Sequence, residues 1–234
     1  MATRELYQDG KYLDLNPDWH AGDSAWKADQ VLKMLTRNNL RPRTVCEVGC
    51  GAGEILAQLH NRMPDDVHFT GYEVSPQAAQ LCEQRRKPGL DFILGDAFAD
   101  PAQYDMVLSL DVIEHVEDIY GFLRALRKKG AHKVFHIPLD LAVYSVLGGT
   151  LIRGRRQLGH IHYFTRATAL ALLEEAGYDV MDWFYTFWAI QSPGQRGGPV
   201  PRRLLRLVRR MMHIVNKELS VRVLGGASIL VLAK

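Results

Sequence analysis

The chain has 234 residues, 47% of them hydrophobic and 24% charged, and its formal net charge is +3. This composition is near the average for globular proteins, which excludes a wholly disordered chain, and the length suits one α/β domain with a full core. Because no run approaches about 18 apolar residues and the first residues lack an apolar signal core, we expect a cytoplasmic protein without a spanning helix. The small basic excess does not by itself indicate a nucleic-acid partner.

Short β-branched runs alternate with helical stretches over the first part of the chain, after a predicted helix over residues 23–37. In chain order, we expect a strand at 44–48, a helix at 54–60, a strand at 67–73, a helix from Pro76, strands at 92–94 and 104–110, a helix at 119–129 and a strand at 134–137. Alternation of this kind predicts a parallel sheet covered by helices on both faces.

The pattern changes after residue 138. A connection without a clean period, over residues 138–163, leads to a helix at 165–176 that ends at Gly177 and a strand at 178–187. The remaining elements are a loop at 191–201, a basic helical insertion at 199–222 and a last strand at 228–233. Because no internal repeat or independent second unit is visible, we expect a single domain, with an N-terminal helical cap over residues 1–40.

A glycine-rich loop joins the first of the alternating strands to its helix. Gly49, Gly51 and Gly53 allow a tight turn and a close approach of the backbone to a ligand at the helix N-terminus. An ordinary strand-to-helix turn is one alternative. A dinucleotide-binding loop is another, although its glycine pattern favours a small residue where this chain has Glu54.

Two acidic residues follow the next strands. Glu73, 20 residues after Gly53, is positioned to accept hydrogen bonds from both ribose hydroxyls of an adenosine cofactor. Asp96 is positioned to accept one from an adenine amino group, beside the backbone amide of Ala97. The alternatives are a solvent-facing acid at a strand tip and a capped turn. Since nicotinamide enzymes share the ribose contact, these acids indicate adenosine rather than one particular cofactor.

Together these motifs resemble the class I S-adenosylmethionine-dependent methyltransferases, of the bacterial small-molecule type that includes the ubiquinone-biosynthesis O-methyltransferases. The resemblance covers roughly residues 24–190 and the last strand, and its motifs are 47–53, 71–73, 94–97, 110–116, 159–165 and 172–178. It implies an α/β, Rossmann-like fold: a seven-stranded, mostly parallel sheet with helices on both faces and an antiparallel last strand between the fifth and sixth.

The resemblance also implies a cofactor, S-adenosyl-L-methionine, and a set of residues that contact it. These are Glu47, Gly49, Cys50, Gly51, Gly53, Glu73, Val74, Asp96, Ala97, Leu110, Asp111 and Lys27, the last as a partner for the methionine carboxylate.

Methyl transfer needs a general base only when the acceptor arrives protonated. By position the candidates are His115, His160 and His162, and the alternative for His115 is a structural histidine packed at a helix start. Asp111, Glu114 and His115 are similar to the acid–acid–His cation site of the ubiquinone-type enzymes. Because the first acid here is the shorter aspartate, we assign no metal.

Two basic segments bear on the acceptor and on partners. Arg153, Arg155 and Arg156 in the connection suit an anionic acceptor, or form a solvated loop. Residues 202–222 hold seven basic side chains against Glu218, and one helical face carries Leu204, Val208, Met211 and Val215. This segment is a peripheral membrane contact, an anion-binding lid, or a helix whose apolar stripe packs on the domain. Nucleic acid is disfavoured because no aromatic side chains are interleaved with the basic ones.

We therefore expect a methyltransferase that uses S-adenosyl-L-methionine to methylate an oxygen or nitrogen of a small or conjugated metabolite, with an anionic acceptor as one option. The alternatives are a nucleic-acid or protein methyltransferase, a non-catalytic S-adenosylmethionine-binding partner protein, and a nicotinamide oxidoreductase. The motifs leave the acceptor and the oligomeric state open.

Overall fold

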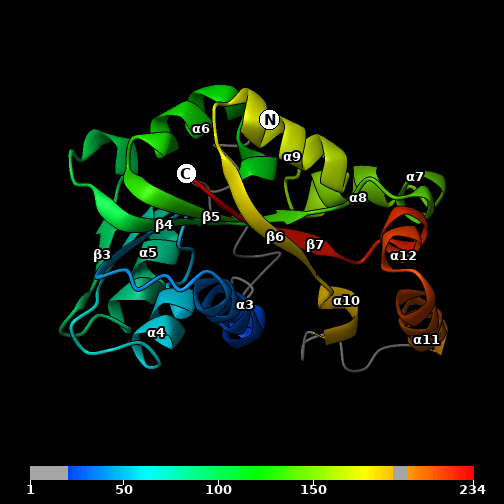
Figure 1. The fold of residues 1–234 in the computed structure, drawn as a ribbon, viewed down its shortest axis with the longest axis horizontal. Coiled ribbons are helices and arrows are strands. Elements are labelled where there is room, and N and C mark those ends of the chain that lie inside the picture. The colour runs from blue at the N-terminus through cyan, green and yellow to red at the C-terminus, as the bar shows by residue number, and fades with distance from the viewer. Residues whose placement is uncertain (1–20, 192–199) are drawn as a thin grey trace.

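The computed structural model describes residues 21–191 and 200–234. The first half of the predicted N-terminal cap and most of the predicted loop at 191–201 lie outside these residues. The described part is built around one seven-stranded sheet (Figure 1).

The strands are arranged in the order β3-β2-β1-β4-β5-β7-β6. They are β1 (Thr44–Val48), β2 (His68–Glu73), β3 (Leu90–Leu94), β4 (Tyr104–Leu110), β5 (Gly130–Pro138), β6 (Val180–Thr186) and β7 (Ser228–Ala233). β7 lies between β5 and β6 and runs antiparallel to both, whereas the other neighbouring strands of this sheet pair in parallel. The expected Rossmann-like sheet, with an antiparallel last strand between the fifth and sixth, is confirmed.

Helices cover both faces of the sheet. In Figure 1 one layer lies above the sheet and the other below it. The helices above are α6 (Ile119–Arg127) and α9 (Arg166–Glu175), and those below are α3 (Ser24–Arg37), α4 (Glu54–His60) and α5 (Pro76–Glu83). Neighbouring residues of one strand enter different cores, because side chains alternate along a strand. Val134 packs in the core below and Phe135 in the core above.

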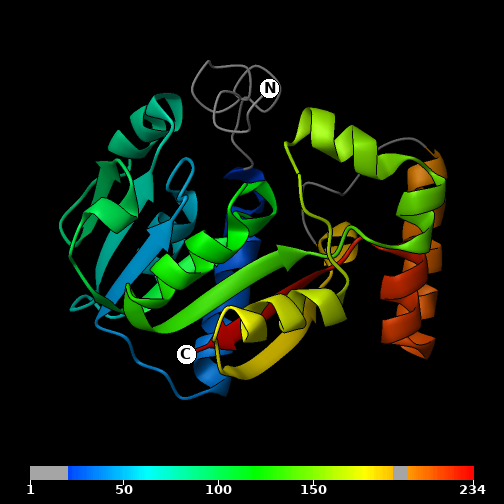
Figure 2. The same ribbon diagram turned by 90° about the horizontal axis from the view of Figure 1, so that it is seen from above.

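The end of the sheet beyond β5, β7 and β6 carries additional helices (Figure 2). These are α7 (Val143–Leu147), α8 (Thr150–Gln157), α10 (Trp188–Gln191), α11 (Val200–Val215) and α12 (Lys217–Leu224). Single 3-10 turns are η1 (Ala21–Asp23), η2 (Ala97–Ala99) and η3 (Ile113–His115). The predicted basic helix is thus two helices, because Asn216 caps α12 by accepting a hydrogen bond from the Leu219 amide at 3.0 Å.

Of the three alternatives for the basic segment, the one in which its apolar stripe packs on the domain is wrong. Leu204, Val208, Met211 and Val215 are between 39% and 87% exposed. The contacts of the helical pair come instead from other residues, such as Val221, which is buried. In the described part of the chain, no helix is both long and apolar enough to cross a membrane.

Candidate cofactor and acceptor site

The glycine loop lies where the strand order reverses, between β1 and β4, which is the position at which parallel α/β sheets bind ligands. Gly49, Gly51 and Gly53 all have positive φ, of 77°, 56° and 76°. A Cβ at Gly49 would come within 2.8 Å of the Val112 side chain, and one at Gly53 within 2.5 Å of the Phe92 ring. Backbone conformation therefore favours glycine at all three positions, and space also requires it at Gly49 and Gly53, so the loop leaves a backbone cradle at the start of α4.

The Glu73 carboxylate stands directly against this cradle. Its Oε2 accepts a hydrogen bond from the Gly51 amide at 2.8 Å, and its Oε1 accepts from the amides of Val74 and Ser75, both at 2.8 Å. Burial raises the pKa of Glu73, while these backbone donors oppose the shift. Three donors leave one lone-pair direction of the carboxylate free to accept from a further hydroxyl.

An apolar shelf continues from the carboxylate along the ends of β2 and β3. Val74 is exposed, and Leu94, the register partner of Glu73, is 57% exposed. Asp96 follows, with its Oδ1 accepting from the Phe98 amide at 2.9 Å and so capping η2, whose first residue Ala97 is buried. Exposed apolar side chains beside an acceptor carboxylate match the needs of a flat heteroaromatic base with an amino group.

A chain of polar contacts, half-buried at Lys27 and Asp111 and buried at His136 and Thr186, links α3 to three strands. Lys27 Nζ lies 2.6 Å from Asp111 Oδ2, and His136 Nδ1 donates to Asp111 Oδ1 at 2.6 Å. The other ring nitrogen, Nε2, lies 2.8 Å from Thr186 Oγ1. Asp111 has φ 55°, unusual for a residue with a side chain, so this network also holds a strained backbone.

The charged groups of this network shift one another's pKa values. Burial alone would raise the pKa of Asp111, but His136 and Lys27 hold it far below its usual range. Burial alone would lower the pKa of Lys27, but Asp111 beside it raises the value above that of a free lysine. Lys27 is therefore engaged by a carboxylate of its own chain, and its predicted contact with a methionine carboxylate stays a prediction.

Two further carboxyls at the same sheet edge are almost completely buried. Glu47 at the end of β1 has one oxygen without a hydrogen-bond partner, and Glu114 in η3 has two. Burial raises the pKa of both well above the usual range, and Lys27 opposes the shift. With Glu73 and Asp111, four carboxyls lie at this sheet edge, and a positively charged ligand beside Glu47 or Glu114 would lower the raised pKa of that carboxyl.

The predicted histidines occupy different positions. His160 Nδ1 donates to Asp140 Oδ2 at 2.7 Å, and the His115 and His160 rings meet edge to face with centroids 4.8 Å apart. His162 is held away from them by a contact of its Nε2 with the Val116 carbonyl oxygen at 2.8 Å. The structure thus brings together His115 and His160, and the Asp140 contact orients His160 as it would a general base.

Glu114, His115 and His160 each offer one donor atom, and these atoms lie within 4.8 Å of one another. Such a set can hold a divalent cation as well as move a proton. The assignment of no metal stays a prediction.

Sequence reasoning did not identify His136, Thr186 or Asp140. His136 is a polar residue inside the apolar run of β5, and that interruption is a usable signal for a satisfied polar network. Asp140 follows β5 directly, at the edge where site residues gather.

Comparison with known proteins places these features in a wider context. A family model described as "Methyltransferase domain" matches residues 19–182. The chain is 30% identical over 99 residues to ajmaline N-methyltransferase from Rauvolfia serpentina, which covers 39% of this chain and 33% of that protein. It is 28% identical over 128 residues to the ubiquinone biosynthesis O-methyltransferase of Idiomarina loihiensis, covering 51% of each. The matches thus span about a third to a half of these relatives.

One similar solved structure is magnesium protoporphyrin IX methyltransferase from Synechocystis PCC 6803 with bound SAH. Its TM-score is 0.60 at 17% identity, and the match covers 93% of this chain and 86% of that one. At this identity the likeness concerns the fold, including the sheet order described above.

Proposed function

The chain belongs to the methyltransferase domain family, and on this premise we propose that it transfers a methyl group from S-adenosyl-L-methionine to an oxygen or nitrogen of a small or conjugated metabolite. The observation that carries this proposal is the set of three positive-φ glycines facing the buried Glu73 carboxylate at the switch point of the sheet.

The residues at this edge fit S-adenosyl-L-methionine in shape and charge. Glu73 retains acceptor capacity for a ribose hydroxyl, and the shelf formed by Val74, Leu94 and Asp96 suits the adenine. The cofactor carries a sulfonium and an ammonium group, and the partnerless oxygen of Glu47 supplies a compensating negative charge once the carboxyl ionises. The remaining predicted contacts, Cys50, Leu110, Asp111 and Lys27, belong to the same proposal.

S-adenosyl-L-methionine supplies a methyl group on a positively charged sulfur, which is an activated leaving group. The chain therefore contributes mainly position and exclusion of water. Where the acceptor is a hydroxyl or an ammonium, His160 accepts its proton at Nε2, because Asp140 holds the proton on Nδ1. His115, whose ring meets that of His160, positions the base.

The acceptor enters, on this proposal, beside the connection over residues 138–163. Arg153, Arg155 and Arg156 are exposed on α8 and form no ion pair within the described residues. Free guanidinium groups near the candidate base support an acceptor that carries a carboxylate or a phosphate. We also propose a single domain in the cytoplasm, with residues 1–40 as a cap and residues 202–222 as a contact with a membrane surface.

A labelled-methyl assay tests the proposed function. The full chain is incubated with S-adenosyl-L-methionine carrying a tritiated methyl group and an extract that contains metabolites, proteins and nucleic acids. We expect label in the small-molecule fraction, and its loss in the His160→Ala variant but not in a His68→Ala variant, since His68 is exposed on β2.

The other outcomes separate the alternatives. Label in precipitated protein or nucleic acid would favour a macromolecular acceptor. Binding of S-adenosylhomocysteine without any transfer of label would favour a non-catalytic partner protein.

A further inference from the structure

Four helices form one continuous end of the molecule, beyond β5, β7 and β6. Figures 1 and 2 both place α7, α8, α11 and α12 there. The Arg209 side chain on α11 joins this helix to α7 and α12, because its guanidinium lies 5.8 Å from the Tyr144 ring centroid on α7 and donates to the Leu224 carbonyl at the end of α12 at 2.8 Å. We call these four helices the helical end.

The outer surface of the helical end is apolar to an unusual extent. Leu147 is 82% exposed and Ile214 83% exposed. Further exposed aliphatic side chains on the same helices are Val143, Val146, Ile152, Leu204, Leu207, Val208, Met211, Val215 and Leu219. Single exposed apolar residues are ordinary on protein surfaces, but a cluster of this size is typical of a surface that binds a membrane or another molecule.

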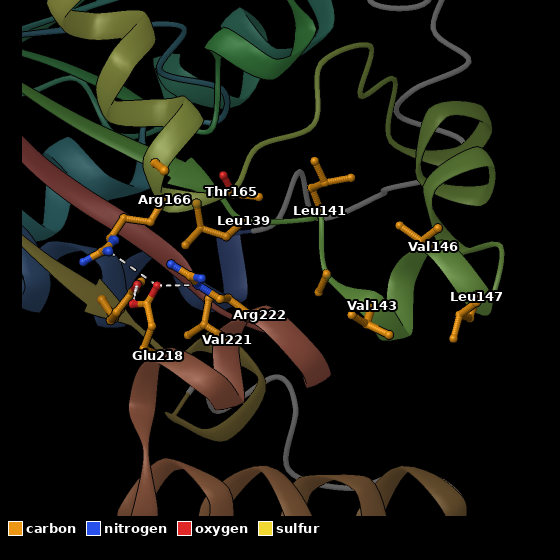
Figure 3. A pocket seen from close by; sticks show the side chains of 13 residues that line it. Leu139, Leu141, Val143, Val146, Leu147, Thr165, Arg166, Glu218, Val221 and Arg222 are labelled. Atoms are coloured by element: carbon orange, nitrogen blue, oxygen red, sulfur yellow. Dashed lines mark hydrogen bonds and ion pairs between the residues drawn. The ribbon is translucent and has the colours of Figure 1, made fainter.

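A cavity of about 540 Å³ opens into this cluster. Figure 3 shows its wall: Val143, Val146 and Leu147 on one side, and Val221 on the other, with Leu139 and Leu141 also lining it. Its few charged groups pair with one another, since Glu218 Oε1 lies 2.7 Å from Arg222 Nε and 3.4 Å from a terminal guanidinium nitrogen of Arg166. A mostly aliphatic cavity whose charges are already paired suits a hydrocarbon chain.

The charge around the cluster is predominantly positive, and Glu218 on α12 is the one acid in the sequence of the four helices. Residues 141–158 contain three arginines and no acid, and residues 204–217 contain four basic residues and no acid. The rest of the chain has 22 Lys and Arg against 26 Asp and Glu, so it is net acidic. Arg153, Arg155, Arg156 and Arg210 are exposed without an ion-pair partner in the described part of the chain.

We propose that the helical end docks on an anionic phospholipid bilayer. Its aliphatic side chains enter the boundary between head groups and acyl chains, its arginines pair with lipid phosphates, and the cavity receives a hydrocarbon chain. A second copy of the chain is a poorer occupant because two surfaces of the same positive sign repel each other. Nucleic acid is poorer because the exposed side chains are aliphatic rather than aromatic.

Docking would bring the proposed transfer site to the membrane. Asp140 and His160 flank the segment that carries α7 and α8, and their 2.7 Å hydrogen bond ties its two ends together. This step rests on the proposed function: if both hold, the acceptor is an amphiphile whose hydrocarbon part stays in the bilayer or the cavity.

Co-sedimentation of the full chain with lipid vesicles, without S-adenosyl-L-methionine, tests the docking. We expect binding to vesicles of phosphatidylcholine and phosphatidylglycerol in equal parts, weak binding to phosphatidylcholine alone, and release by high salt. The triple variant Arg153→Gln, Arg155→Gln, Arg156→Gln should bind the anionic vesicles roughly a hundredfold more weakly. The double variant Ile214→Ser, Val215→Ser should bind roughly tenfold more weakly.

Matched variants on other surfaces control for general effects. Arg41, Arg124 and Lys128 are exposed basic residues outside the helical end, and Ile93 and Met181 are exposed apolar ones. Changing the first three to glutamine, or the last two to serine, should leave vesicle binding unchanged.

Three results would overturn the proposal. They are no binding to anionic vesicles, equal binding by the helical-end variants and the wild type, and a stable dimer by light scattering that Ile214→Ser, Val215→Ser dissociates. The vesicle assay contains neither cofactor nor acceptor. A failure to bind vesicles therefore does not affect the proposed methyl transfer, and a failure of methyl transfer does not affect the proposed docking.

Discussion

The edge of the sheet that carries the glycine loop, Glu73 and Asp111, here called the cofactor edge, and the helical end depart from the usual distribution of side chains in opposite directions. At the cofactor edge Glu47, Glu114 and His136 are buried polar groups, whereas at the helical end Leu147 and Ile214 are apolar groups in solvent. Both arrangements cost free energy in the isolated chain, since buried charge loses hydration and exposed aliphatic surface orders water. On our proposals, a cationic cofactor offsets this cost at one region and a lipid surface offsets it at the other.

The comparison predicts that charge pairing stabilises the cofactor edge strongly. Replacing Lys27 by Met leaves the half-buried Asp111 with only His136, so the free energy of unfolding should fall by about 1–3 kcal/mol. Since the pKa of Asp111 is depressed in the folded chain, its stabilisation is present above about pH 4 and is lost as the pH falls toward that depressed value. Urea unfolding of both proteins across this range should show the difference shrinking in acid.

The exposed Lys128→Met variant is the control, and it should unfold like the wild type. A loss below about 0.5 kcal/mol for Lys27→Met would mean that the pair is merely a surface contact.

The second prediction concerns the ligand at the cofactor edge. The Glu73→Gln variant replaces a charged acceptor of ribose hydroxyls by a neutral one, so affinity for S-adenosylhomocysteine should fall roughly tenfold to a hundredfold. Isothermal titration measures this directly. Glu83→Gln, on the exposed surface of α5, should bind like the wild type. An equal loss of affinity in both variants would contradict a contact between Glu73 and the ligand.

The third prediction uses the raised pKa of Glu47. A positively charged ligand lowers that pKa, so binding of S-adenosyl-L-methionine should release up to one proton and tighten as the pH rises, at most tenfold per pH unit. Titration in two buffers of different ionisation enthalpy counts the protons. Glu47→Gln should abolish the release, whereas proton uptake by the wild type would contradict a cationic ligand beside this carboxyl.

The smallest expected effect is at the helical end. Because Ile214 and Val215 are exposed, the double serine variant should change the free energy of unfolding by less than about 0.5 kcal/mol. Ile229→Ala in the buried β7 should instead cost about 2–5 kcal/mol. A comparable cost for the serine variant would mean that these side chains pack on the chain itself, and the contrast between the two regions would disappear.

The two regions also differ in how far the sequence predicts them. The bounds of β1, β4 and β7 follow from apolar runs and come out as expected, and the glycine spacing locates the cradle. The start of β5 is missed because His132 and Lys133 interrupt its apolar pattern. Periodicity predicts an apolar stripe on α11 correctly, but it carries no information on whether that stripe faces a core or solvent.

Pairings within the site lie beyond local patterns. Lys27 reaches Asp111 from another layer of the fold, and His136 meets Thr186 across 50 residues of sequence. Such contacts depend on the relative placement of α3, β4, β5 and β6, which no short motif encodes. The sequence therefore indicates which residues are candidates, and the structure determines which of them are partners.

The central claim, that the glycine loop and Glu73 form a site for S-adenosyl-L-methionine, is tested most directly by isothermal titration of the full chain with S-adenosylhomocysteine and, separately, with NADH. We expect saturable binding of S-adenosylhomocysteine at one site per chain and no heat of binding from NADH. Tight binding of NADH without binding of S-adenosylhomocysteine would contradict it.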